Sequence, residues 1–231
     1  MMKYLIKFAS KALLLFVLST ITLNATSKHK LIGHLFDIGV FKFGTFTLKS
    51  GKTSPFYIDL RMLASYPLVL EEVTQEFWKI ANECDYQHIC GVPYSGLVIA
   101  SALCATHHQP MLIKRKEAKE YGTKKMIEGV FKHSDTCLVI EDIITTGQSI
   151  LETTQELKSQ GLLVKDVVVL IDRQESGIEN VMRHNHSVHA IFTLSEIAHY
   201  LYATNRITRE QASCLFGNNE SARTKFEYIS E

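Results

Sequence analysis

One stretch of the sequence combines residue types that suggest a definite chemistry. It reads Glu141-Asp142-Ile143-Ile144-Thr145-Thr146-Gly147-Gln148-Ser149, after a Val/Ile-rich run and before a helical pattern. A strand that ends in a small-residue turn and a helix N-terminus presents free backbone N–H groups and the positive end of the helix dipole. Hydroxyls at Thr145, Thr146 and Ser149 would add donors, and Gly147 would let the backbone approach an anion. The stretch therefore predicts a phosphate site.

Two acidic residues, Glu141 and Asp142, stand directly in front of this turn. Paired carboxylates suit the hydroxyls of a sugar, or a sugar that carries a metal ion. The simpler alternative is a capped helix start with a solvated acidic pair, and it would explain a threonine-rich turn alone. The whole stretch after an apolar strand is more specific, and it favours a phosphorylated sugar.

The elements that must position this stretch alternate between α and β. Short apolar runs recur along the chain at His88–Val92, Met111–Ile113, Cys137–Ile140 and Val167–Ile171. Helical patterns follow the first and third runs at Gly96–Ala105 and Ser149–Gln160, the second ended by Gly161. This alternation predicts an α/β fold with a mostly parallel sheet that is covered on both faces. Ligands bind at the carboxyl ends of such strands.

The flanking segments complete the expected domain. Helices are predicted at Lys30–Ile38 and Pro67–Cys84, and a helix with Ser195 as N-cap at Ser195–Tyr202. Further strands are predicted at Val40–Leu48, Pro55–Leu60 and Val188–Leu194, with a turn at Lys49–Lys52.

The acidic pair, two hydrophobic residues and Thr/Gly/Ser turn at 141–149 are similar to the signature by which type I phosphoribosyltransferases bind phosphoribosyl pyrophosphate (PRPP). The resemblance implies that the acidic pair holds the ribose hydroxyls and that the turn grips the 5′-phosphate. It also implies that family's fold, with a small N-terminal hood. Glu141 stands where many members have aspartate, which lengthens the side chain and is expected to keep its charge.

Two segments resemble the part of the orotate phosphoribosyltransferases that binds the base. Residues 43–51 and 54–59 look like the hood, so Lys49 would meet an anionic ligand while Phe56 and Tyr57 flank a flat heterocycle. Arg173 aligns with the arginine that pairs with the orotate carboxylate, which a guanidinium fork fits well. Taken alone, these segments equally fit a β-hairpin with core aromatics and a surface arginine.

Two more segments resemble the parts that contact pyrophosphate. In the basic loop 114–122, Arg115, Lys116 and Lys119 match the family's catalytic loop, whereas Tyr121 replaces a histidine of many bacterial members. That loop reaches the neighbouring subunit's site in the family, which implies a homodimer. At 91–96, Tyr94 matches the pyrophosphate loop and Ser95 replaces a lysine. Charged surface and simple turn glycines are the plainer interpretations of these two segments.

The resemblance covers residues 30–205 and is closest to the orotate domain of the bifunctional eukaryotic-type enzyme. The 26 residues after Asn205 leave no room for that enzyme's decarboxylase half. The resemblance implies transfer of ribose 5-phosphate from PRPP to orotate in pyrimidine biosynthesis. Asp142 and the basic loop residues would act in catalysis, and Mg²⁺ would be held mainly through PRPP, without direct protein ligands.

Composition narrows the other possibilities. The 231 residues suit one well-buried domain, and a net charge of +1 gives no sign of nucleic-acid binding. Five cysteines and ten histidines show no metal-ligand spacing, so buried, reduced thiols are expected rather than zinc or redox chemistry.

Residues 1–26 have the pattern of a secretory signal, with lysines before the apolar run Ala12–Leu23. A true export signal, an interfacial anchor and translated sequence upstream of the start remain open. PRPP is cytosolic, so an uncleaved or upstream extension before a cytoplasmic domain at 27–231 is favoured, with no other membrane association.

Three rival functions also remain open. A type I transferase for another base is the nearest, although Lys49 and Arg173 favour an anionic base. A catalytically silent PRPP-sensing regulator is disfavoured by the intact basic loop and by the lack of a helix-turn-helix pattern. An export-targeted relative with altered function rests on residues 1–26 alone.

Overall fold

The computed structural model describes residues 28–47, 51, 53–116, 126–216, 224 and 226. Residues 1–26 lie outside this range, and so do Lys49, Lys119 and Tyr121 of the predicted site. The expectations that concern them stay predictions.

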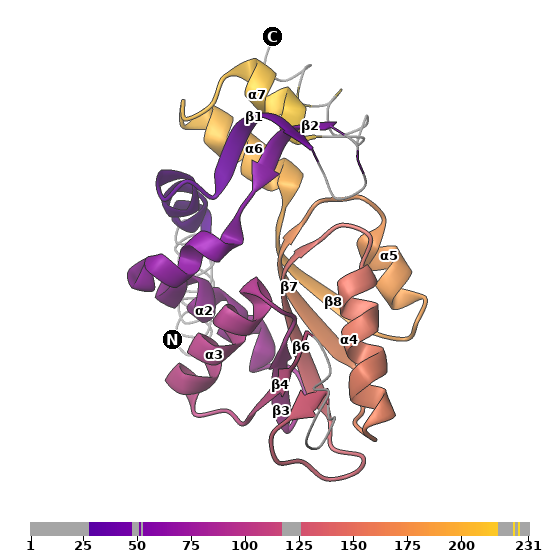
Figure 1. The fold of residues 1–231 in the computed structure, drawn as a ribbon. Helices are drawn as coiled ribbons and strands as arrows, with labels where there is room; N and C mark the ends of the chain where they lie inside the picture. Colours follow the sequence, from indigo (N-terminus) through magenta and orange to yellow (C-terminus); the bar gives the residue numbers. More distant parts are fainter. Residues whose placement is uncertain are drawn as a thin grey trace, which may run out of the picture.

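A six-stranded sheet in the order β5-β4-β3-β6-β7-β8 forms the centre of the described chain (Figure 1). Its strands pair in parallel except for the short edge strand β5, which is antiparallel to β4. The predicted mostly parallel sheet is therefore confirmed. The strands are β3 (His88–Gly91), β4 (Met111–Lys114), β5 (Ile127–Glu128), β6 (Cys137–Ile144), β7 (Asp166–Asp172) and β8 (Ser187–Thr193).

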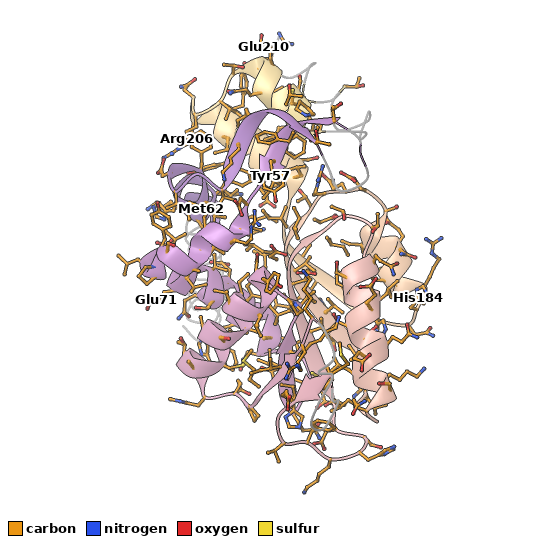
Figure 2. All side chains as sticks on the ribbon, in the orientation of Figure 1. Tyr57, Met62, Glu71, His184, Arg206 and Glu210 are labelled. Carbon is orange, nitrogen blue, oxygen red and sulfur yellow. The ribbon has the colours of Figure 1, made fainter. Side chains whose placement is uncertain are left out.

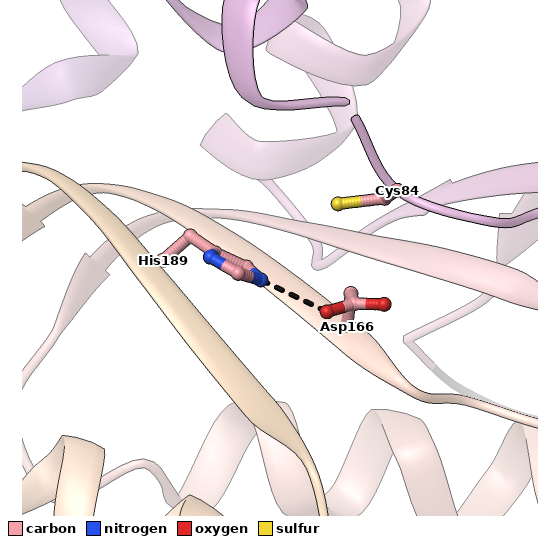
Figure 3. Close-up of side chains that lie close together, drawn as sticks. All are labelled: Cys84, Asp166 and His189. Atoms are coloured by element: carbon pink, nitrogen blue, oxygen red, sulfur yellow. Dashed lines mark hydrogen bonds and ion pairs between the residues drawn. The ribbon is translucent and has the colours of Figure 1, made fainter. Parts of the chain in front are cut away.

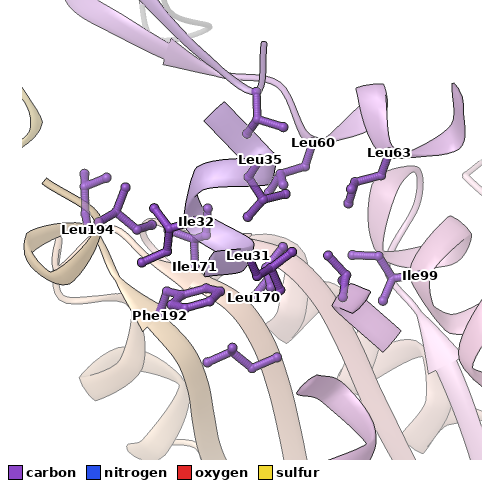
Figure 4. Close-up of a cluster of buried hydrophobic side chains, with 14 of the residues drawn as sticks. Leu31, Ile32, Leu35, Leu60, Leu63, Ile99, Leu170, Ile171, Phe192 and Leu194 are labelled. Carbon is purple, nitrogen blue, oxygen red and sulfur yellow. The ribbon is translucent and has the colours of Figure 1, made fainter. Parts of the chain in front are cut away.

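Helices cover both faces of this sheet, as the continuous apolar strands require. Along β7, Val168 and Leu170 belong to one hydrophobic cluster and Val167 and Val169 to the other, since successive side chains point to opposite faces. The first face carries residues 28–37, α2 (Pro67–Ala81) and α3 (Ser95–His107); the second carries α4 (Gln148–Ser159) and α5 (Gly177–Met182). Figure 4 shows Leu31, Ile32 and Leu35 packed on the first face.

The predicted hood is a two-stranded antiparallel sheet at one end of the molecule. It consists of β1 (Phe41–Thr47) and β2 (Thr53–Ile58), followed by the 3-10 helix η1 (Leu60–Ser65). Figure 2 shows Tyr57 of β2 at the end of the molecule that also carries the C-terminal helices. These are α6 (Leu194–Ala203) and α7 (Arg209–Leu215), of which the sequence predicted only the first. A capping box between Thr208 and Gln211 begins α7.

Two helix ends test the local predictions. Gly161 ends α4 as expected: its N–H donates to the Lys158 carbonyl (3.0 Å) and the Leu162 N–H to the Leu157 carbonyl (3.1 Å), which is the Schellman pattern. The predicted N-cap at Ser195 is wrong. The Thr193 hydroxyl caps α6 by accepting from the Glu196 N–H (3.2 Å). Ser195 instead donates both its N–H and its hydroxyl to the Gln174 side-chain oxygen.

The cysteines fit the expectation of reduced thiols, since all five are free and Cys90, Cys104 and Cys137 are buried. Membrane crossing needs a long apolar helix, and the part of the chain that the structure describes contains none.

Candidate active site

The segments that follow four parallel strands meet at one edge of the sheet, as the carboxyl-end rule predicts. They come after β3, β4, β6 and β7. The hood strand β2 places the Phe56 ring against Arg173, which follows β7. Glu141, Asp142, Ile143 and Ile144 are the last four residues of β6, and Phe56 and Tyr57 lie on β2. The other predicted site residues within the described range lie on the segments that follow the strands.

The turn after β6, which we call the phosphate turn (residues 145–149), has the geometry of an anion site. Gly147 is the N-cap of α4 with φ +78, and no side chain caps this helix. Within the described part of the chain, the backbone N–H groups of the turn donate to no other residue. Asn180 supports the turn from behind, where its side-chain amide donates to the Thr146 carbonyl (2.8 Å). The turn therefore leaves its donors available to a ligand.

The two acidic residues before the turn are not equivalent. Glu141 is 5% exposed and its Oε1 accepts from the Asp142 N–H (3.0 Å). Burial, with the Asp142 charge second, raises the pKa of Glu141 well above its usual range. Glu141 is buried because α3 packs closely on β6 at Gly96. A Cβ at Gly96 would lie 2.6 Å from the Ile140 carbonyl oxygen, so only glycine allows this close approach. Burial therefore works against the charge that the sequence predicted for Glu141, because it destabilises the carboxylate relative to one in water.

Asp142 is half-buried, and its Oδ1 accepts from the Ile143 N–H (2.9 Å). Ile143 and Ile144 form the last two positions of β6, and Ile144 is buried in the cluster below α4. Asp142 is thus the more exposed of the two acidic residues, and it lies in front of the phosphate turn.

Two positively charged side chains near the acidic pair were not predicted from the sequence. Lys114, at the end of β4, donates to the Thr153 hydroxyl (3.1 Å), and its charge partly offsets the raised pKa of Glu141. Arg61 pairs with Asp59 (2.7 Å) and interacts electrostatically with Asp142. Lys114 stands at the end of an apolar run, which is a usable signal. Nothing in the spacing marks Arg61.

An open hollow of about 470 Å³ lies between the turns that follow β3 and β4. Lys116 Nζ lies 5.0 Å above the Tyr94 ring, and Arg115 Nη1 lies 3.2 Å from Glu128 Oε1. Ser95, buried, begins α3 beside Tyr94. The structure thus brings together four residues of the two predicted pyrophosphate segments. The hollow is lined by Pro93, Tyr94, Leu97, Ile113, Lys114, Arg115, Lys116 and Glu128.

Arg173 follows β7, and its backbone N–H donates to the Ile144 carbonyl (3.0 Å). This hydrogen bond holds the Arg173 backbone beside the phosphate turn. Its guanidinium carbon lies 4.9 Å above the Phe56 ring, and Nη2 lies 2.9 Å from Glu175 Oε1. The side chain is only 16% exposed, and its Nε is buried without a hydrogen-bond partner in the described chain. The plainer interpretation, a solvated arginine at a strand end, does not fit this burial.

The two hood aromatics make different contacts. Phe56 and Tyr57 are consecutive on β2, so their side chains point to opposite faces of the strand. Phe56 is buried against Arg173, whereas the Tyr57 ring lies 5.7 Å from Phe46 and its hydroxyl accepts from Arg61 (3.2 Å). That both residues contact the base stays a prediction, and the structure places only Phe56 against Arg173.

Comparison with known proteins identifies the family. No family model matches the chain. The chain is 38% identical over 180 residues to an orotate phosphoribosyltransferase of Caenorhabditis elegans, covering 77% of this chain and 79% of that protein. The chain belongs to the orotate phosphoribosyltransferase family. It is also 44% identical over 182 residues to the uridine 5'-monophosphate synthase of Bos taurus, covering 78% of this chain and 38% of the bovine protein.

The fold agrees with this assignment. A solved UMP synthase of Leishmania donovani matches with a TM-score of 0.76 and 35% identity, over 81% of this chain and 41% of that one. Membership of the orotate phosphoribosyltransferase family confirms the predicted type I fold. The chain spans less than half the length of the two UMP synthases.

Proposed function

We propose that this chain transfers ribose 5-phosphate from PRPP to orotate, giving orotidine 5′-phosphate and pyrophosphate. The observation that carries the proposal is the buried guanidinium of Arg173 held beside an uncapped phosphate turn. The turn suits the 5′-phosphate of one substrate, and the guanidinium suits the carboxylate of the other. A transferase for a neutral base would have no use for a buried, fixed cation at this position.

PRPP would lie along the carboxyl edge of the sheet. The phosphate turn would hold its 5′-phosphate through backbone N–H groups, the hydroxyls of Thr145, Thr146 and Ser149, and the neighbouring Gln148. Asp142 would accept from the ribose hydroxyls, with the buried Glu141 behind it. The pyrophosphate would face the hollow that Tyr94, Arg115 and Lys116 line, with Ser95 next to Tyr94 at the start of α3. The sequence adds Lys119 and Tyr121 to this group.

Orotate would be held from the opposite side. Its carboxylate would pair with Arg173, whose guanidinium lies over the Phe56 ring. Glu175 occupies one edge of that guanidinium, so orotate would replace one carboxylate by another. Lys49 would contribute a further cation from the hood, as the sequence suggests.

The reaction would break the C1–oxygen bond to pyrophosphate and form a C1–N1 bond to orotate. The pyrophosphate leaves with the bonding electron pair, and the deprotonated N1 supplies the pair for the new bond. Cations of the basic loop stabilise the charge that develops on the leaving group. No covalent enzyme intermediate is needed, so no nucleophilic serine or cysteine is invoked.

Magnesium fits this site as a companion of PRPP. Asp142 offers the hard oxygen donor that Mg²⁺ prefers, whereas Glu141 is 5% exposed and its carboxyl already accepts from the Asp142 N–H. Asp142 would therefore orient the ion through the ribose hydroxyls, with PRPP oxygens as its main ligands. When bound, Mg²⁺ supplies neutralising charge for the pyrophosphate.

A homodimer with shared sites follows from the same region. Tyr94 (61% exposed) and Ile113 (46% exposed) present apolar surface at the rim of the hollow. A second copy covering this rim would place its own basic loop near the pyrophosphate. We further propose one catalytic domain at 27–231 that acts in the cytoplasm, where PRPP is found, with residues 1–26 as an extension.

The decisive experiment is a spectrophotometric assay of orotate loss with PRPP and Mg²⁺, run in parallel with hypoxanthine and uracil. Turnover of orotate alone would support the proposal. Turnover of another base would replace orotate by that base. Binding of PRPP without any turnover would instead identify a PRPP-sensing regulator and overturn the enzymatic proposal.

A further inference from the structure

Three side chains that could bind a metal converge far from the active site: Cys84, Asp166 and His189 (Figure 3). One potential ligand atom of each lies within 4.8 Å of the others. His189 Nε2 lies 2.9 Å from Asp166 Oδ1, and all three residues are half-buried. Among the residues that the structure describes, this is the one group of three or more His, Cys, Asp and Glu side chains with such spacing.

The fold explains why they meet. Asp166 begins β7 and pairs with Ser187 of β8, so His189, two residues further, points to the same face of the sheet. Cys84 follows the end of α2, the helix that covers this face. β8 is the edge strand, which leaves the cluster reachable from solvent.

We propose that Cys84, Asp166 and His189 form a binding site for one zinc ion. A thiolate sulfur, an imidazole nitrogen and a carboxylate oxygen are the ligand types that zinc accepts, and zinc commonly binds three protein ligands plus water. In a tetrahedral zinc site with bonds of about 2.0–2.3 Å, ligand atoms lie roughly 3–4 Å apart. The observed spacing therefore requires only small side-chain rotations. The partial exposure of the cluster leaves the fourth position to water.

The free thiol is not a preformed anion. Burial, with the Asp166 charge second, raises the pKa of Cys84 to about 11. The cysteine consequently carries its proton at neutral pH, and a bound cation would displace that proton to solvent as the sulfur–metal bond forms. The Asp166–His189 hydrogen bond holds these two side chains together before the ion binds. When both bind the ion, this bond is replaced by bonds to zinc, the neutral imidazole carries its proton on the ring nitrogen that does not bind zinc, and the carboxylate supplies negative charge.

This site is separate from the catalytic one. Asp166 is the first residue of β7, whereas Asp172, beside the base-binding Arg173, is the last. Zinc there would join the end of α2 to the edge of the sheet and so stabilise the fold without contacting either substrate. The ligands lie far apart in the sequence, which is why spacing alone predicted no metal site.

The test uses the full chain, stripped of metal and titrated without PRPP. We expect one equivalent of zinc by elemental analysis, and with Co²⁺ a near-ultraviolet charge-transfer band that reports a cobalt–thiolate bond. Zinc at a hundredfold excess over its Kd should raise Tm by about 5 °C or more. Cys84→Ser should abolish the band and weaken zinc binding at least tenfold.

Cys214→Ser is the matched control, because Cys214 is also free and half-buried but lies outside the cluster. It should keep the band. If Cys84→Ser does not fold, His189→Gln provides the second variant, with circular dichroism and orotate turnover as checks of folding. Absence of the band in the unmodified chain, or its persistence in both Cys84→Ser and His189→Gln, would overturn the proposal.

Discussion

The two halves of the proposed active site are built differently. The phosphate turn is one continuous segment that offers backbone N–H groups at the start of α4. The base end, which we define as Phe56, Arg173 and Glu175, is assembled from the hood and the segment after β7. The phosphate turn therefore forms from one continuous segment of the chain. The base end forms only where the hood packs against the segment that follows β7.

The difference has an energetic consequence. The amides of the phosphate turn are held in place by the backbone, so a phosphate meets donors that need no rearrangement. Arg173 is already paired with Glu175, so orotate must replace an existing ion pair. Binding at the base end should therefore depend on single side chains, and binding at the phosphate turn on backbone geometry.

The largest effect is expected from Arg173→Ala. Removing the guanidinium takes away a buried partner of the orotate carboxylate, at a cost of about 4 kcal/mol, or about 10³-fold in kcat/KM for orotate. KM for PRPP should change little. Steady-state kinetics with each substrate varied will measure both.

Arg206→Ala is the control, since Arg206 also lies over a phenylalanine ring, that of Phe36, and pairs with Asp37, but outside the site. It should leave kcat/KM unchanged. An Arg173→Ala enzyme with normal use of orotate would refute the role of the base end.

The next effect is expected from Gly147→Ala. A Cβ at this position would lie 2.6 Å from Val181 Cγ2 and 3.0 Å from the Gly177 carbonyl oxygen, so the phosphate turn must shift. A displacement of this kind costs about 10²-fold in kcat/KM for PRPP. Gly39→Ala provides the control, because Gly39 has nearly the same φ (+79 against +78) but open space around it. Equal losses in the two variants would mean that the turn geometry is unimportant.

Asp142→Asn and Glu141→Gln should separate the acidic pair. Burial raises the pKa of Glu141 and so works against its charge, so an uncharged, isosteric amide should cost less than about threefold. Loss of the Asp142 charge should cost about 30-fold in kcat/KM for PRPP. Equal effects would show that both acids act as charges on bound PRPP.

A smaller effect is expected from Glu175→Gln. The substitution removes the carboxylate that competes with orotate for Arg173. KM for orotate should fall about threefold, a typical value for a partly exposed ion pair. A rise in KM would instead identify Glu175 as a residue that positions the guanidinium for binding.

The smallest effect is on stability and pH. Folding raises the pKa of Glu141. The stability that this carboxyl contributes to the folded state is therefore fully present below the ordinary carboxyl pKa, and it is lost as the pH rises through the folded pKa. Glu141→Gln should therefore raise Tm by a few degrees at pH 8 and by less at pH 4.5. Thermal unfolding across this range measures it, with the exposed Glu152→Gln as control. A variant difference that grows toward low pH would contradict the assignment.

Much of the architecture could be predicted from local patterns. Apolar runs specified the strands of a parallel sheet, and Gly161 marked the end of α4, because burial and backbone conformation act on neighbouring residues. The phosphate turn was predictable for the same reason, since its chemistry lies within one segment. The short elements β5, α5 and α7 were missed, because their formation depends on what they pack against.

The sequence by itself indicated the family, the order of the long helices and sheet strands, and the segment that we propose binds phosphate. Only the tertiary structure decided that burial raises the pKa of Glu141 and that Phe56 faces Arg173 while Tyr57 does not. It also decided that Ser195 donates to Gln174 instead of capping its helix, and that Cys84 lies near His189. The physical reason is common to all four. Burial and side-chain contact depend on segments far apart in the chain, and no local pattern records which of them will meet.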